Sequence, residues 1–70
     1  MATLADLKKI YVSHDADGNG VLELDEAEQA YKALGSHAKH FDNFEAEFKK
    51  IAKNGTITFD DFKHFSNVNY

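Results

Sequence analysis

The sequence predicts a small all-α domain with four helices, arranged as two helix–loop–helix halves. Apolar residues recur at helical spacing in four separate segments of the chain. A glycine lies in the turn between the two helices of each half, at Gly20 and at Gly55. The halves also align as an internal repeat, because the Gly-Val-Leu run at 20–22 matches the Gly-Thr-Ile run at 55–57. A length of 70 residues suits one domain, residues 1–70, with repeats at 1–35 and 36–70.

The composition excludes several classes of function. The net charge is −4 and all eight basic residues are Lys, which is unfavourable for binding nucleic-acid phosphates. The chain has no Cys, so neither a disulfide nor a Cys-based metal site supports its small core. No apolar run approaches the roughly 18 residues of a membrane span. The Met-Ala-Thr start shows no signal peptide and no myristoylation glycine, so a cytoplasmic location is the default expectation.

The first helix is expected to begin after Thr3, whose hydroxyl can cap it, with Asp6 in its first turn near the positive end of the helix. Residues at helical spacing form its apolar face: Leu4, Leu7, Ile10, Tyr11 and His14. This face should pack against the remaining helices and lead directly into the first loop.

The first loop is a twelve-residue segment from Asp15 to Glu26 with oxygen-bearing side chains at positions 1, 3, 5, 9 and 12. Calcium prefers about six to eight oxygen ligands, so this spacing suits it. Val21 at position 7 would contribute its backbone carbonyl, and Gly20 permits the sharp turn at position 6. Glu26 would bind with both oxygens, while Glu23 would act directly or through a water. The predicted ligands are Asp15, Asp17, Asn19, Val21, Glu23 and Glu26.

This combination of spacing, residue type and glycine resembles the loop of the EF-hand calcium-binding family. The resemblance extends over nearly the whole chain. It implies a paired EF-hand domain in which a short two-stranded antiparallel β-link, with Leu22 opposite Ile57, joins the two loops. It also implies reversible binding of Ca²⁺. His14 departs from the aromatic residue usual at its position, and we expect a half-buried polar substitute, with a pH-sensitive group as the alternative.

The helix after the loop is expected over Glu23–Leu34, with Gly35 as its stop. Its apolar face is thin and consists of Ala27, Ala30, Tyr31 and Leu34. Residues 36–40 then form a connector that contains His37 and His40. If the connector is helical, these two rings share a face and can hold a borderline metal ion, whereas the simpler interpretation is a solvated linker.

The second half is expected to supply most of the core, because all six Phe lie between residues 41 and 65. A third helix is predicted from Asp42 or Asn43, ended by the Asn-Gly pair at 54–55. After a short strand at 56–58, Thr58 should cap the last helix, with Asp61 three residues further on. The inward-facing residues of these two helices are Phe41, Phe44, Phe48 and Ile51, and then Phe59, Phe62 and Phe65.

The second loop lacks the ligands of the first. The apolar face of the third helix places the start of this loop at Ala52, so Ala52 to Asp61 gives ten residues instead of twelve. Asp61 at the final position reaches less far than Glu, and Lys50 and Lys53 bring positive charge nearby. We therefore expect a degenerate, structural repeat without an ion, and one Ca²⁺ per chain.

The expected function is calcium binding and not catalysis, because no Ser lies in a nucleophile motif and the acids gather where an ion would take them up. A sensor would expose apolar surface to a protein target helix, and the Phe content favours this role. The alternative is a calcium buffer or a calcium-stabilised module without a target. A dockerin-like module fits less well, since a helix precedes Asp15 and the second loop is ligand-poor. A monomer or a weak homodimer is expected.

Overall fold

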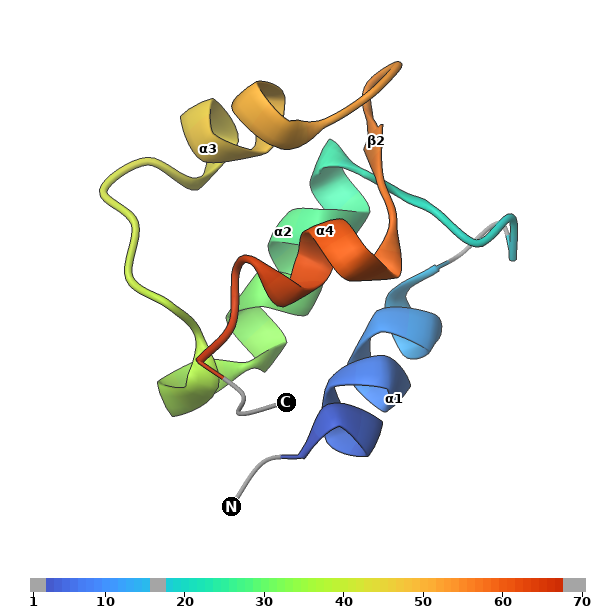
Figure 1. The fold of residues 1–70 in the computed structure, drawn as a ribbon, viewed down its shortest axis with the longest axis vertical. Coiled ribbons are helices and arrows are strands. Elements are labelled where there is room, and N and C mark those ends of the chain that lie inside the picture. The colour runs from blue at the N-terminus through green and yellow to red at the C-terminus, as the bar shows by residue number, and fades with distance from the viewer. Residues whose placement is uncertain (1–2, 16–17, 68–70) are drawn as a thin grey trace.

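The computed structural model describes residues 3–15 and 18–67. Within them the chain forms four α-helices, one short 3₁₀ helix and a two-stranded sheet (Figure 1). The α-helices are α1 (Leu4–His14), α2 (Leu24–Ala33), α3 (Phe44–Ile51) and α4 (Phe59–Lys63). The remaining elements are β1 (Leu22–Glu23), the 3₁₀ helix η1 (Gly35–His37) and β2 (Thr56–Ile57). This confirms the helical class with a small antiparallel link.

The two strands pair antiparallel, with Leu22 opposite Ile57 and Glu23 opposite Thr56 (Figure 1). The register is the one that the repeat alignment predicts. Both Leu22 and Ile57 are fully buried, so their side chains fix the pairing, since a shift by one residue would turn them away from the core. The strands thereby bring the two inter-helical loops together.

Local capping explains where three of the helices begin. Thr3 and Asp6 form a reciprocal capping box at α1, in which the Thr3 N–H donates to Asp6 Oδ2 at 3.0 Å. Asn43 Oδ1 accepts the Ala46 N–H at 3.1 Å and starts α3. At α4 the Thr58 hydroxyl accepts the Asp61 N–H at 3.3 Å. These starts confirm the sequence predictions.

Two sequence signals for the end of α3 disagree, and the structure decides between them. The Asn-Gly pair at 54–55 predicts an end close to the pair, whereas the apolar face of the helix predicts a loop that starts at Ala52. α3 ends at Ile51 and Ala52 is already extended, which confirms the loop start at Ala52. The reason lies downstream, because Lys53 and Thr56 pair with each other across a tight turn. Residues committed to that pairing cannot continue a helix, so the helix ends before the turn begins.

The core is shared between the two repeats. Its buried apolar residues are Leu7, Tyr11, Leu22, Ala27, Ala30, Leu34, Phe44, Phe48, Ile57, Phe62 and Phe65. Six of these eleven belong to the first repeat, so the expectation that the second repeat supplies most of the core holds only for its aromatic bulk. The small Ala residues of α2 let neighbouring helices approach closely, and the Phe rings fill the remaining volume.

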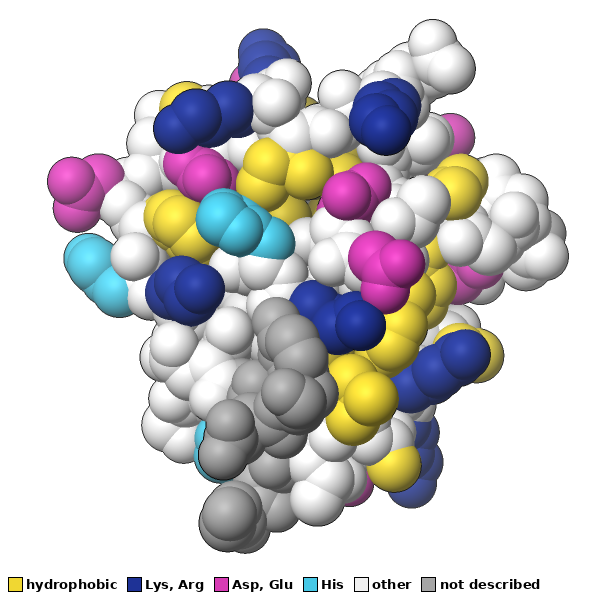
Figure 2. All heavy atoms as spheres, in the orientation of Figure 1, with side chains coloured by type: hydrophobic (Ala, Val, Ile, Leu, Met, Phe, Trp, Pro, Cys, Tyr) yellow, Lys and Arg dark blue, Asp and Glu magenta, His cyan; other side chains and the backbone are white. Residues whose placement is uncertain are grey.

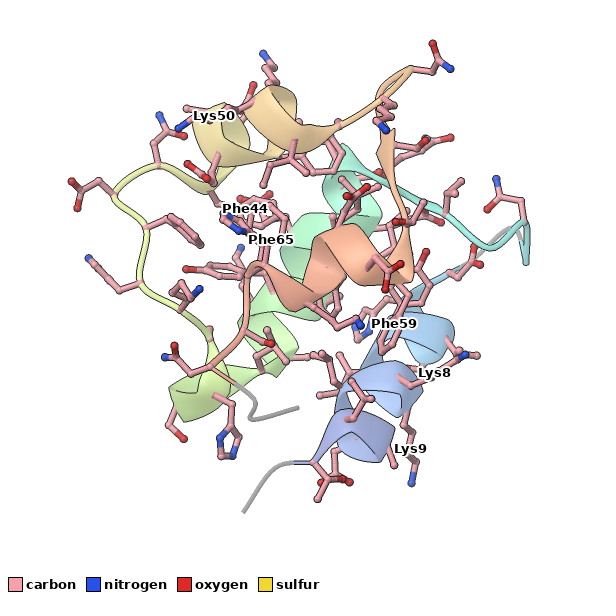
Figure 3. All side chains as sticks on the ribbon, in the orientation of Figure 1. Lys8, Lys9, Phe44, Lys50, Phe59 and Phe65 are labelled. Carbon is pink, nitrogen blue, oxygen red and sulfur yellow. The ribbon has the colours of Figure 1, made fainter. Side chains whose placement is uncertain are left out.

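Two of the six Phe lie at the edge of the core. Phe41 and Phe59 are half-buried, whereas the other four are buried. Lys8 and Lys63 place their ammonium nitrogens 5.3 and 5.6 Å from the centre of the Phe59 ring, at the contact between α1 and α4 (Figure 3). On the face drawn in Figure 2, a strip of hydrophobic side chains is accordingly bordered by Lys side chains.

The connector between the repeats is fixed to the end of the described chain. The Lys39 N–H donates to the Phe65 carbonyl at 2.9 Å, and the Asn67 N–H donates to the His37 carbonyl at 2.7 Å. In Figure 1 this contact lies at the opposite end of the molecule from the paired strands. None of the helices in the described part of the chain is long and apolar enough to span a bilayer.

Candidate metal-binding loop

The loop begins at Asp15, directly after α1, and the carboxylate of this residue is unusual. Its Oδ2 accepts the Gly20 N–H at 2.8 Å. Its Oδ1 is buried and is the one buried side-chain oxygen or nitrogen without a hydrogen-bond partner among the residues that the structure describes. Leaving a carboxylate oxygen buried and unpaired is unfavourable unless a cation or another donor reaches it. The chemistry of this oxygen therefore fits a bound cation.

The middle of the loop turns sharply around its glycines. Gly20 has a φ of +85°, a conformation that L side chains rarely adopt. The Asn19 Oδ1 accepts the Val21 N–H at 3.2 Å, which holds the side chain of one predicted ligand against the backbone of the next. Asp15, Asn19 and Val21 are thus brought into one hydrogen-bonded turn. Asp17, another predicted ligand, lies outside the described residues.

The two remaining predicted ligands lie at the start of α2. The Glu23 N–H donates to Glu26 Oε1 at 2.9 Å, so Glu26 caps α2 from within its first turn. Glu23 is exposed and Glu26 is half-buried. Within residues 3–15 and 18–67, no three His, Asp or Glu residues form a group that could hold a metal ion. Closely spaced acids repel one another without a cation, and the full ligand set remains a prediction.

Tyr11 contacts the candidate loop, although the sequence pattern predicts it only as a core residue. Its side chain is 4% exposed, and its hydroxyl donates to the Gly20 carbonyl at 2.5 Å and to the Ile57 carbonyl at 3.3 Å. Burial, together with the negative charges of Asp15, Asp61 and Glu26, raises the pKa of Tyr11 to about 12. A signal for this role was present in the sequence, because a buried Tyr hydroxyl needs a hydrogen-bond partner.

The second loop is closed by backbone hydrogen bonds. The Lys53 N–H donates to the Thr56 carbonyl at 2.9 Å, and the Thr56 N–H donates back to Lys53 at 3.1 Å. Between them Asn54 and Gly55 have φ values of +56° and +78°, as in a two-residue type I′ hairpin turn. This tight turn lies at the place in the second repeat that corresponds to the candidate ligands of the first.

The histidines do not form a second site in the described part of the chain. His14 is half-buried, as expected, and its Nδ1 lies 2.9 Å from the Ile10 carbonyl oxygen, which can only accept a hydrogen bond. The 3₁₀ helix ends at His37, so the connector does not place His37 and His40 on one helical face. His40 instead lies 3.6 Å from Asp42.

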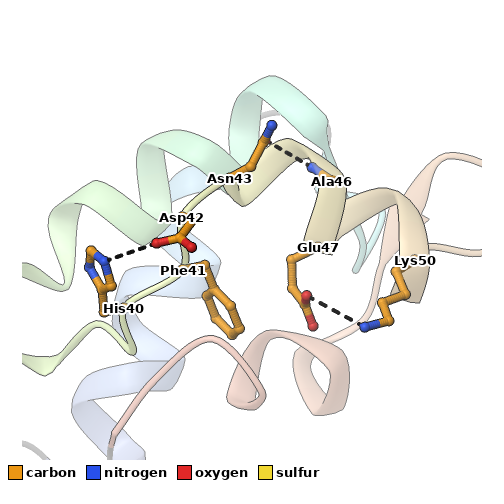
Figure 4. Close-up of a pocket in the computed structure, with 7 residues that line it drawn as sticks. All are labelled: His40, Phe41, Asp42, Asn43, Ala46, Glu47 and Lys50. Atoms are coloured by element: carbon orange, nitrogen blue, oxygen red, sulfur yellow. Dashed lines mark hydrogen bonds and ion pairs between the residues drawn. The ribbon is translucent and has the colours of Figure 1, made fainter.

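A surface hollow of about 610 Å³ lies between the connector and α3 (Figure 4). Polar side chains that line it contact their neighbours: Glu47 Oε2 lies 2.9 Å from His64 Nε2, and Glu47 Oε1 lies 3.9 Å from Lys50 Nζ. Phe41, at its edge, stacks on the ring of His64 at a centroid distance of 5.7 Å. The hollow contains none of the predicted calcium ligands, and the contact of Glu47 with His64 joins α3 to the end of α4.

Comparison with protein-family models, with curated proteins and with solved structures gives no match. The interpretation of the loop therefore depends on the chemistry of residues 15–26 and on the fold that presents them.

Proposed function

We propose that this protein binds one Ca²⁺ per chain in the loop from Asp15 to Glu26, in the manner of an EF-hand. The observation that carries the proposal is the buried, unpaired Oδ1 of Asp15 at the first ligand position. Asp15, Asp17, Asn19, the Val21 carbonyl, Glu23 and Glu26 would hold the ion. A bound Ca²⁺ would neutralise the acids that gather in this loop.

The pairing of the loops supports an EF-hand type of domain. Leu22, at the eighth position of the first loop, lies opposite its counterpart in the second repeat, Ile57, in the two-stranded link. The second repeat supplies this partner strand and a set of packed Phe rings, but its loop is a hairpin turn. It would serve as the structural support of an ion-binding first repeat.

The burial of the Phe side chains bears on the role of the ion. The expectation of a calcium sensor rested on surplus Phe surface, yet Phe44, Phe48, Phe62 and Phe65 are all packed inside, the most exposed of them at 9%. This packing favours a calcium-stabilised module or buffer over a sensor. A sensor that engages a protein target helix would require the ion to open the contact between the helices and uncover these rings.

Calorimetric titration of the intact chain with calcium tests the proposal. We expect a stoichiometry of one and a dissociation constant in the range of about 10⁻⁷–10⁻⁴ M. Magnesium should bind more weakly, because it prefers near-ideal octahedral geometry to a bidentate carboxylate. Absence of binding at millimolar calcium contradicts the proposal, and two ions per chain contradict the structural role of the second repeat.

Binding of a dye to exposed apolar surface separates the two roles. A calcium-stabilised module takes up dye only without calcium, when its core is loosened. A sensor takes up dye only with calcium, when its Phe rings become accessible. Amide NMR spectra recorded with and without calcium show in addition whether the chain is folded in both states.

A further inference from the structure

The side chain of Tyr11 lies at the contact between the two repeats. Its ring packs edge-on against Phe59 and tilted against Phe62, with centroid distances of 5.5 and 5.7 Å. Because these contacts with α4 hold the ring, the hydroxyl at its tip has little freedom of position. It points to the place where the first loop and strand β2 meet.

The Tyr11 hydroxyl begins a chain of hydrogen bonds that runs through Gly20 to the carboxylate of Asp15. Tyr11 donates to the Gly20 carbonyl, and the Gly20 N–H donates to Asp15 Oδ2. Gly20 is therefore held on both sides, through its carbonyl and through its amide. Its carbonyl belongs to the peptide that joins it to Val21, the residue predicted to offer its own carbonyl to the ion. The same hydroxyl also reaches the Ile57 carbonyl in β2.

We infer that Tyr11 is a positioning residue for the calcium site. Its hydroxyl holds the Gly20–Val21 peptide and, through the Gly20 amide, the Asp15 carboxylate in the orientation that receives the ion. Its contact with Ile57 couples this orientation to the second repeat. The second repeat, which supplies no predicted ligand, thereby sets the calcium affinity of the first. This inference rests on the proposed calcium binding in residues 15–26.

Tyr31 provides a matched control within the same chain. It too is an aromatic residue whose hydroxyl donates to a backbone carbonyl, that of Lys39, at 2.5 Å. Its ring stacks on Phe44 at a centroid distance of 4.6 Å, and its hydroxyl contact lies in the connector. Tyr31→Phe thus removes the same atom and the same kind of hydrogen bond as Tyr11→Phe, outside the loop.

The test compares calcium affinity in the unsubstituted chain, Tyr11→Phe and Tyr31→Phe by calorimetry, with thermal unfolding of the metal-free proteins alongside. We expect Tyr11→Phe to weaken calcium binding about tenfold, the effect of losing one orienting hydrogen bond, and Tyr31→Phe to leave the affinity within about twofold. A purely structural role for Tyr11 predicts lower stability of both variants with unchanged affinity, and that result overturns the inference.

Amide hydrogen exchange of the metal-free proteins separates this inference from the proposed function. The Gly20 amide should exchange faster in Tyr11→Phe and at an unchanged rate in Tyr31→Phe. If the unsubstituted chain binds no calcium, the proposed function fails, while the exchange at Gly20 still tests the positioning. If Tyr11→Phe does not fold, NMR of the unsubstituted chain decides: a protected Tyr11 hydroxyl proton supports the contact, and a freely exchanging one overturns it.

Discussion

The second helix begins in the same way in both repeats, but the segment before it differs between them. At α2 the Glu23 N–H donates to the Glu26 carboxylate at 2.9 Å, and at α4 the Thr58 N–H donates to the Asp61 carboxylate at 3.1 Å. Glu26 and Asp61 occupy the same place in the repeat and cap their helices in the same way. The shared part of the repeats is therefore the strand, the cap and the helix start.

The segment before each strand separates the two repeats. In the first, Asp15 keeps a buried oxygen without a partner among the described residues, and the turn is held by side chains. In the second, Lys53 and Thr56 satisfy each other across a two-residue turn. Backbone groups that pair with each other need no further partner, whereas a buried, unpaired carboxylate oxygen needs a cation or another donor. A few residues between helix and strand thus separate the repeat that we propose to bind an ion from its partner.

The largest expected effect comes from exchanging the equivalent acids. Glu26→Gln should weaken calcium binding by more than the roughly 10–100-fold that loss of an outer partner of a metal site costs, because it removes a charged ligand. Asp61→Asn, the matched change in the second repeat, should leave calcium affinity within about twofold and lower stability by about 1 kcal/mol at most through its cap. Calorimetry and urea unfolding measure the two. Equal losses of affinity would contradict the assignment of the ion to the first loop.

Tyr11, which contacts both loops, gives a pH-dependent effect. Its folded-state pKa of about 12 lies above the unfolded value of 10.0, so the unfolded chain loses this proton first as the pH rises. The protonated Tyr11 hydroxyl stabilises the folded state, and this contribution is fully present below pH 10. It is lost between pH 10 and pH 12, and the free energy of unfolding falls by at most about 2–3 kcal/mol. Urea unfolding of metal-free protein across this range should show a steeper loss for the unsubstituted chain than for Tyr11→Phe. Parallel curves would contradict the raised pKa.

The smallest expected effect concerns the closed turn of the second repeat. Gly55 has a φ of +78°, and a Cβ built on it meets no atom within 4 Å, so Gly55→Ala tests backbone strain alone. It should destabilise the chain by about 1–2 kcal/mol. The neighbouring change Asn54→Gly, also at a positive φ, should change the free energy of unfolding by about 0.5 kcal/mol or less. Thermal unfolding compares the two, and a neutral Gly55→Ala would mean that the turn rearranges without cost.

The sequence predicts this fold where a local pattern determines it. The caps at Thr3, Asn43 and Thr58 and the register of Leu22 with Ile57 follow from side-chain chemistry and from the repeat. The end of α3 at Ile51 follows from the apolar face of the helix but not from the Asn-Gly pair. Such a pair suits a helix end and a hairpin turn equally, and the pairing of Lys53 with Thr56 decides between them.

The sequence predicts which residue types form the candidate site, but it predicts less well how their side chains are arranged in space. The position of Asp15 after a helix follows from the pattern, but its unpaired Oδ1 depends on how the Gly20 amide occupies the other oxygen. The contact of the Tyr11 hydroxyl with Ile57 joins residues 46 positions apart in the chain. Periodicity places Tyr11 on the inner face of its helix and says nothing about where its hydroxyl ends.

The hydrogen bonds between the connector and residues 65–67 have a mechanical consequence. The paired strands join the two repeats at one end of the molecule. At the other end, Lys39 and His37 of the connector bond to Phe65 and Asn67, so the segment between α2 and α3 is fixed to the residues that follow α4. Moving the connector away from the end of α4 would break these backbone hydrogen bonds, which lie far from the loop at residues 15–26. We therefore expect that a calcium ion bound as proposed would tighten this arrangement and would not open it.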